Sequence, residues 1–261
     1  MELCPLPGNE RRRYAATVPG VSSPTIMHRN PNRSCIPWER AKCRFVGERA
    51  MRFKDRTEAG IKLADALSAY ENEPGVVYPL PRGGVVLGIE IADRLRMPID
   101  LIIPRKIGHP QNPEYAICAV AETGDVVCNE WERRRADPQW LEQRIRNERK
   151  EARRRRERYL GRKAPLPVAG QIAIIVDDGI ATGLTMQAAI RDAKQRKPKR
   201  LVVAIPVAPM ETAERIAQEV DDLVGLEISA HYLGAVGAYY EHFPQVSDEE
   251  VITLMERSAA A

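Results

Sequence analysis

The chain has 261 residues, of which 44% are hydrophobic and 29% are charged, and its formal net charge is +4. This balance predicts one globular domain with additions. No apolar run is long enough to cross a membrane, no secretory leader pattern opens the chain, and no HExxH, GxSxG or Walker A motif occurs. The five cysteines, an odd number, form no CxxC pair, so we expect neither a disulfide framework nor a zinc site, and a cytoplasmic location.

Residues 1–50 differ in composition from the rest of the chain. They are rich in proline, carry the basic run Arg11–Arg13 and lack a sustained hydrophobic period. This composition predicts a disordered basic extension, with the folded domain in residues 51–261. Met51 directly precedes the first clear helical pattern, so a second interpretation is that translation starts there and that the extension is not made.

The folded part opens with a helical pattern at 55–70, where Asp55 and Glu58 have the spacing of a capping box. A buried strand near 76–80 and a helix near 84–96 follow, separated by a Pro-Arg-Gly-Gly turn.

That turn has the residues of an anion site. Gly83 and Gly84 allow backbone N–H groups to point at an anion, and Arg82 supplies a positive fork suited to a diphosphate. The glycine spacing is not GxGxxG, which disfavours a dinucleotide-binding fold.

A third strand is expected at 99–104, and Arg105 and Lys106 follow it as adjacent cations. The next residues are rich in Gly, Pro and Asn, which predicts a mobile polar loop before a strand near 117–121. The alternative for the two cations is a solvated surface, and His109 is better explained as a loop residue than as a general base.

The basic charge of the chain gathers at about 130–163. Residues 138–160 predict a long helix that starts near Pro138, with a narrow apolar stripe for docking and Glu/Arg pairs on its other faces. Its run Arg153–Arg156 is compatible with nucleic-acid binding through 144–163. Without an aromatic platform, a solvated face is the favoured interpretation.

The most informative segment is Ile172–Thr185, IAIIVDDGIATGLT. A buried parallel strand ends at Asp177 and Asp178, and a short Gly/Thr loop opens a helix at about 184–196. Such a loop offers free backbone N–H groups to a phosphate, while the two carboxylates suit sugar hydroxyls or Mg²⁺. Together they predict a ligand that carries both a sugar and a phosphate.

This loop resembles the phosphoribosyl-diphosphate (PRPP) motif of type I phosphoribosyltransferases. The resemblance covers Ala173–Val176 and the loop after it, and Gly179 departs from the pattern because a larger apolar residue is commoner there. The whole run from Met51 to Met255 resembles a bacterial group of predicted phosphoribosyltransferases whose acceptor is undefined. The matching loop positions are Asp177, Asp178, Ile180, Ala181, Thr182, Gly183 and Thr185.

The resemblance implies a role for each part. Thr182, Gly183 and Thr185 would hold the 5-phosphate of PRPP, and the two acids would bind the ribose hydroxyls and Mg²⁺. The turn Arg82–Gly84 would hold the diphosphate, with a cis peptide bond between Pro81 and Arg82. Arg105 and Lys106 would belong to a catalytic loop that closes over the substrate.

It also implies a fold and an acceptor class. We expect an α/β fold, a Rossmann-like open parallel sheet with helices on both faces, plus a small hood and the basic helical insertion. Further strands and helices are expected at 201–207 and 210–220. The acceptor would be a small nitrogenous compound, and Ala181 stands where hypoxanthine- and guanine-type enzymes usually carry an Asp, which predicts poor use of 6-oxopurines.

The tail 235–255, with the segment before the first helix as a further candidate, would supply the hood. Tyr239, Tyr240 and Phe243 are candidates to stack on a base, and the alternative for Phe243 is packing in the core. Ser247 and Glu250 have the spacing of a second capping box. A regulator of the same fold, which senses PRPP or a nucleotide and binds RNA or DNA through the basic helix, is the alternative function. The sequence leaves a homodimer open and indicates no membrane partner.

Overall fold

The computed structural model describes residues 43–45, 52–123 and 126–260. A five-stranded parallel sheet with the order β1-β8-β7-β6-β2 forms its centre. This confirms the expected Rossmann-like α/β sheet. The strands are β1 (Cys43–Phe45), β2 (Gly75–Pro79), β6 (Ile172–Val176), β7 (Arg200–Pro209) and β8 (Asp222–Ser229).

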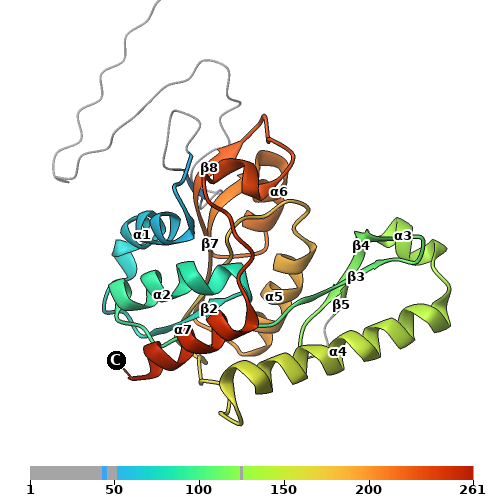
Figure 1. Cartoon of the computed structure of the whole chain (residues 1–261), viewed down its shortest axis with the longest axis horizontal. Coiled ribbons are helices and arrows are strands. Elements are labelled where there is room, and N and C mark those ends of the chain that lie inside the picture. The colour runs from blue at the N-terminus through green and yellow to red at the C-terminus, as the bar shows by residue number, and fades with distance from the viewer. Residues whose placement is uncertain (1–42, 46–51, 124–125, 261) are drawn as a thin grey trace, which may run out of the picture. The chain divides into compact units, whose positions relative to one another are not determined.

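Helices cover both faces of this sheet (Figure 1). Alternate strand residues point to opposite sides, so that Ile174 and Val202 pack with the first pair of helices while Ile175 and Val203 pack with the second pair. The first pair is α1 (Arg56–Ala66), followed by the 3₁₀ turn η1 (Ser68–Tyr70), and α2 (Gly83–Leu95); the second pair is α5 (Leu184–Gln195) and α6 (Met210–Ala217).

Both expected capping boxes are present. Asp55 Oδ1 accepts a hydrogen bond from the N–H of Glu58 at 2.9 Å at the start of α1. At the start of α7 (Asp248–Ala260), the N–H of Glu250 donates to Ser247 Oγ at 3.1 Å, and Glu250 Oε2 accepts from the N–H of Ser247 at 2.6 Å. These side chains satisfy N–H groups that have no partner within the helix.

The strand expected at 99–104 is wrong apart from one bridge, in which Ile99 pairs with Val77 of β2. The N–H of Leu101 donates to Asp100 Oδ1 at 2.7 Å, so it does not continue the ladder. Leu101 and Ile103 are instead buried between α4 (Pro138–Leu160) and α7. These residues are apolar because they are buried, and the sequence pattern therefore resembles that of a strand although they do not pair as one.

The irregular loop expected after Lys106 is also wrong, while its expected mobility stays a prediction. Residues there form an antiparallel three-stranded sheet, here called the hairpin arm, and the strand expected near 117–121 belongs to it and not to the parallel sheet. The physical reason is apolar cover, because Ile107 and Ile117 are buried in a cluster that includes Leu141 of α4. The arm consists of β3 (Arg105–His109), β4 (Asn112–Val120) and β5 (Val126–Cys128).

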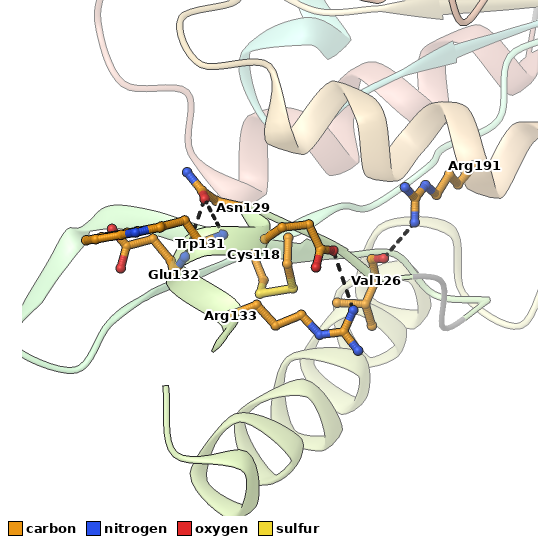
Figure 2. The surroundings of a disulfide bond; sticks show 9 residues. Cys118, Val126, Asn129, Trp131, Glu132, Arg133 and Arg191 are labelled. Atoms are coloured by element: carbon orange, nitrogen blue, oxygen red, sulfur yellow. Dashed lines mark hydrogen bonds and ion pairs between the residues drawn. A yellow bond between two sulfur atoms is a disulfide. The ribbon is translucent and has the colours of Figure 1, made fainter. Parts of the chain in front are cut away.

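A disulfide joins Cys118 of β4 to Cys128 of β5 (Figure 2). The two residues face each other in the antiparallel register, with Cα atoms 4.0 Å apart. Our expectation that the cysteines form no disulfide is therefore wrong, because it used sequence spacing and ignored cross-strand pairing. The cysteine count consequently gives no information about the compartment.

The basic helix is confirmed as α4, preceded by α3 (Glu130–Arg135), and Asp137 caps it by accepting from the N–H of Trp140 at 2.7 Å. Leu141, Ala152 and Tyr159 are buried along its docking stripe. Its arginine run is not one solvated face, because Arg156 is buried.

Most of the extension 1–50 lies outside the described residues. In contrast to the expectation for that segment, Cys43–Phe45 form β1 and pair with β8. No helix in the described part of the chain is long and apolar enough to span a membrane.

Candidate active site

The carboxyl end of β6 leads into the loop that starts α5. Gly183 is the N-cap of this helix and has a φ of 84°, which favours glycine. Two loop carbonyls are bound from α6: Thr212 Oγ1 donates to Ala181 O at 3.0 Å, and Arg215 Nη2 donates to Thr182 O at 2.8 Å. These bonds hold the loop in place. The N-cap makes no side-chain hydrogen bond, and the first N–H groups of α5 have no partner within the helix, so they can bind an anion.

The hydroxyl residues of the loop lie at the same helix start. Thr182 is exposed, and Thr185 in the first turn of α5 is half-buried. Both are accessible to a ligand that binds the N–H groups. The arrangement has the features expected for a phosphate site.

The glycine turn after β2 lies directly against the acidic pair. The peptide bond Pro81–Arg82 is cis, as the resemblance implied. A Cβ on Gly83 would collide with Asp178 Oδ2, and a Cβ on Gly84 would lie 2.7 Å from Val176 O. Both positions therefore exclude side chains, and two motifs that are far apart in the chain form one site.

Asp177 and Asp178 differ in their partners. Asp178 Oδ2 accepts a hydrogen bond from Arg56 Nε at 2.7 Å, and both side chains are largely buried. Asp177 Oδ1 accepts from the N–H of Asp178 at 2.9 Å, and no ion-pair partner contacts Asp177 among the described residues. The loop thus contains one paired and one unpaired carboxylate.

The unpaired carboxylate carries the larger electrostatic cost. Burial raises the pKa of Asp177 well above its usual range, and the neighbouring charge of Asp178 adds to this effect. Burial also raises the pKa of Asp178, but the charge of Arg56 opposes it. The site therefore has an excess of buried negative charge that a cation or hydroxyl donors would stabilise.

Arg56 connects this pair to the hood, and the sequence analysis missed it. Its Nη1 donates to Pro244 O at 2.6 Å, and its guanidinium lies 3.7 Å from the centre of the Phe243 ring. Tyr240 OH donates to Asp178 O at 2.7 Å from the same side. One signal was available, since an arginine in the first turn of a helix opposes the helix dipole and indicates a partner elsewhere.

The hood aromatic residues pack in the core. Tyr239 and Tyr240 are 2% and 3% exposed, and the Tyr240 ring lies 5.4 Å from Phe53 and 4.7 Å from Phe243. The option that Tyr239 and Tyr240 stack on a base is therefore wrong. The segment before α1 contacts this tail, because the N–H of Phe53 donates to Tyr239 O at 2.8 Å.

The side chains of Arg105 and Lys106 point in opposite directions, because they are neighbouring residues of a strand. Arg105 Nε donates to Glu148 Oε2 of α4 at 3.0 Å. Lys106 is exposed, and its positive charge opposes the effect of burial on the pKa of both Asp177 and Asp178. Of the two expected catalytic cations, Lys106 has a charge that lowers the pKa of the acidic pair, while Arg105 forms an ion pair with Glu148.

Arg82 also has a partner within the chain. Its Nη1 lies 3.7 Å from Asp248 Oδ1 at the start of α7. The same carboxylate accepts from Tyr159 OH at 2.6 Å and from Arg158 Nη1 at 2.7 Å. In this structure the Arg82 side chain therefore lies toward α7, beside the glycine turn.

Residues 53–240 match the family described as Phosphoribosyl transferase domain. The chain belongs to this family. Two Mycobacterium tuberculosis proteins, from strains CDC 1551 / Oshkosh and ATCC 25618 / H37Rv and provisionally named phosphoribosyl transferases, are each 38% identical over 208 residues. These residues are 79% of this chain but 47% of either relative, so the chain spans about half the length of the curated proteins it matches.

A solved structure has a similar fold and sequence. The crystal structure of TT1426 from Thermus thermophilus is 42% identical and superposes with a TM-score of 0.68, covering 79% of this chain and 99% of that one. The fold of this phosphoribosyl transferase domain thus accounts for nearly the full length of TT1426.

The phosphoribosyl transferase domain has carboxylates for a metal, but too few to hold one alone. Within the described residues, no group of three or more His, Cys, Asp or Glu side chains could hold an ion. Mg²⁺ prefers a few carboxylates together with phosphate oxygens and water. Asp177 and Asp178, with their excess buried charge, fit a cation that is bound jointly with a phosphorylated substrate.

Proposed function

We propose that this chain is an Mg²⁺-dependent phosphoribosyltransferase that uses PRPP as donor. A ring or amide nitrogen of the acceptor forms a bond to C1 of the ribose, while the bond from C1 to the diphosphate oxygen breaks. The diphosphate leaves with the electron pair, and the nitrogen loses its proton to a base or to water. Positive charge develops on the ribose in the transition state.

The binding roles follow the geometry of the site. The start of α5, with Thr182, Gly183 and Thr185, binds the 5-phosphate through N–H groups and hydroxyls. Asp177 accepts hydrogen bonds from the ribose hydroxyls. Asp178 is held by Arg56, and its N–H orients the carboxylate of Asp177. The remaining lone pairs of Asp178 accept further hydrogen bonds from the ribose.

The leaving diphosphate lies over the turn Arg82–Gly84, where the backbone can approach because neither glycine has a side chain. Lys106, on the hairpin arm, supplies a cation. Mg²⁺, held by Asp177 and Asp178 with the substrate, would neutralise charge on the leaving group. Arg105 positions β3 through its ion pair with Glu148. Catalysis arises from orientation and electrostatic stabilisation, without a covalent intermediate.

One observation carries this proposal: the glycine turn lies against the acidic pair, next to a helix start with free N–H groups. A diphosphate, a ribose and a phosphate would each meet a suitable group within one ligand.

The nucleic-acid regulator is less well supported, because several α4 arginines are engaged within the chain. Arg154 and Arg155 donate to Glu151 at 2.7 and 2.9 Å, and Arg156 Nη2 donates to Asp100 at 2.6 Å. Arg158 binds Asp248 and Glu249 of α7. These pairs reduce the positive charge that is free to contact phosphates.

Calorimetry with PRPP, with and without Mg²⁺, tests the proposal, followed by a screen of nucleobases for diphosphate release. We expect Mg²⁺-dependent binding that Asp177→Asn abolishes. Asp93→Asn, on the exposed side of α2, is the matched control. Salt-dependent nucleic-acid binding without PRPP binding would favour the regulator.

A further inference from the structure

Helix α6 lies directly behind residues 177–183, the loop that leads into α5 and is here called the phosphate loop. Thr212 Oγ1 donates to Ala181 O at 3.0 Å, and Arg215 Nη2 donates to Thr182 O at 2.8 Å. The two donors are three positions apart in α6, so they lie on one face of the helix. A Cβ on Gly183 would lie 3.0 Å from Thr212 Cγ2, which shows how closely α6 approaches the loop. Two consecutive carbonyls of the loop are therefore held from the same side.

The position of α6 is itself fixed by packing. Ala213 and Ile216 are fully buried in the apolar cluster that also contains Ile180 of the phosphate loop. The N–H of Ile180 donates to Val207 O of β7 at 2.8 Å, and α6 begins directly after β7 ends. The loop and the helix that holds its carbonyls are thus attached to the same strand.

The two carbonyl contacts determine where the N–H groups of the loop point. In a planar trans peptide the C=O and N–H bonds point in opposite directions, and both peptide bonds here are trans. Thr212 binds the carbonyl of the Ala181–Thr182 peptide, so the N–H of Thr182 points away from α6. Arg215 binds the carbonyl of the next peptide, so the N–H of Gly183 also points away from α6.

The N–H of Thr182 is available to a ligand. Thr182 is exposed, and its N–H has no backbone acceptor among the described residues. The charged guanidinium of Arg215 adds a second effect, because a hydrogen bond to one end of a peptide group polarises it and strengthens the N–H at the other end as a donor. The contacts from α6 therefore both orient and strengthen donors of the phosphate loop.

We propose that Thr212 and Arg215 are positioning residues for the 5-phosphate of the substrate, an inference that rests on the proposed function. They act through the loop and do not contact the phosphate. Each holds one peptide plane, so that the N–H groups of Thr182 and Gly183 face the phosphate together with the first N–H groups of α5.

Two probes separate the parts of the site. Ribose 5-phosphate carries the 5-phosphate without the leaving group, and inorganic diphosphate with Mg²⁺ represents the leaving group alone. Calorimetric titration of the full chain measures both affinities. We expect Thr212→Val, which keeps the shape of the side chain but lacks the hydroxyl, to weaken ribose 5-phosphate binding about 5-fold, and Arg215→Met to weaken it about 10-fold. Diphosphate affinity should stay unchanged, because the turn Arg82–Gly84 does not depend on α6.

Conservative variants distinguish positioning from a merely structural role. Thr212→Ser and Arg215→Lys each keep a donor for the same carbonyl and should recover most of the affinity. Arg200→Met is the matched control for the loss of one positive charge, because Arg200 lies at the start of β7, at the opposite end of the strand from α6, and pairs with Asp222. It should bind both probes as the wild type does.

The outcomes are distinct. Unchanged ribose 5-phosphate affinity in Thr212→Val and Arg215→Met, an equal loss of both probes, or a lack of recovery in the conservative variants would overturn the inference. Absence of ribose 5-phosphate binding by the wild type would also overturn it. Binding that depends on Thr212 and Arg215, without diphosphate release from PRPP with any acceptor, would support the positioning role and contradict the proposed function.

Discussion

Arg56 donates through Nε to Asp178 at 2.7 Å and through Nη1 to Pro244 O at 2.6 Å. One guanidinium thus connects the start of α1, the acidic pair and the hood. Because these three segments are far apart in the chain, the contact couples the geometry of the site to the stability of the whole domain.

We therefore predict that Arg56→Met lowers the free energy of unfolding by about 3–5 kcal/mol, as expected when one partner of a buried ion pair is removed. Urea unfolding measures this change. Arg94→Met is the control, because Arg94 pairs with Glu71 at a more exposed position and should cost less than about 1 kcal/mol. Equal losses in the two variants would contradict the role of Arg56.

The two acids should behave in opposite ways. Asp178→Asn leaves Arg56 without its charged partner and should lower the unfolding midpoint at about pH 7. Asp177→Asn removes a buried carboxylate whose raised pKa shows that its charge is unfavourable in the folded state, so the midpoint should rise. Both variants should lose PRPP binding. A stabilised Asp177→Asn protein that still binds PRPP would refute the assignment of this carboxylate.

Substitutions of Lys106 and Arg105 should also have different effects. Lys106→Ala removes a cation that acts on the acidic pair and should lower kcat/KM for PRPP by about 10²-fold, with little change in the thermal midpoint. Arg105→Ala should lower the midpoint, because Glu148 is largely buried and keeps only Arg144 as partner among the ion pairs of the described residues. If steady-state kinetics show a larger loss of kcat/KM for Arg105→Ala than for Lys106→Ala, the proposed role of Lys106 is wrong.

Glu122 should make the stability depend on pH. Its folded-state pKa of about 7 lies above the ordinary value of 4.5, so the folded state binds this proton more tightly than the unfolded state does. The free energy of unfolding therefore falls as pH rises from about 4.5 to about 7. Glu122→Leu removes this contribution. The free energy of unfolding of the variant, relative to that of the wild type, should therefore increase by up to roughly 3 kcal/mol across that interval. Denaturant titrations at about pH 5 and about pH 8 would detect it, and a constant difference would argue against it.

The acceptor prediction depends on Ala181, which has no side chain that can manage a purine proton. A general base typically contributes about 10²–10⁴-fold, so hypoxanthine and guanine should be turned over slowly compared with adenine or orotate. Side-by-side rates with the four bases decide this. Hypoxanthine or guanine as the best substrate would refute it.

The strands and loops around the site were predictable where local pattern and packing agree. Asp177 and Gly183 follow a buried strand and open a helix, and both signals are present in consecutive residues. The close approach of Gly83 to Asp178 was implied by the sheet edge that their strands share. Arg56 was not predictable, because its partners at 178 and 244 are brought to it by tertiary structure alone.

The hairpin arm shows a different limit. Its Gly, Pro and Asn residues have the composition of a loop, but Ile107 and Ile117 are buried in the cluster with Leu141, which is far along the chain. Cys118 and Cys128 could be paired only once β4 and β5 were known to be antiparallel neighbours. Local composition cannot predict an element whose stability comes from a distant helix.

The bond from Arg56 to Pro244 has a practical consequence for engineering this domain. The family match ends at residue 240, and a protein trimmed to that boundary would keep both acids, the glycine turn and the phosphate loop. It would nevertheless lose Pro244, which holds Arg56, and Asp248, which lies beside Arg82. Sequence boundaries drawn around the motifs alone would therefore yield a fragment with every recognisable residue and a misaligned site.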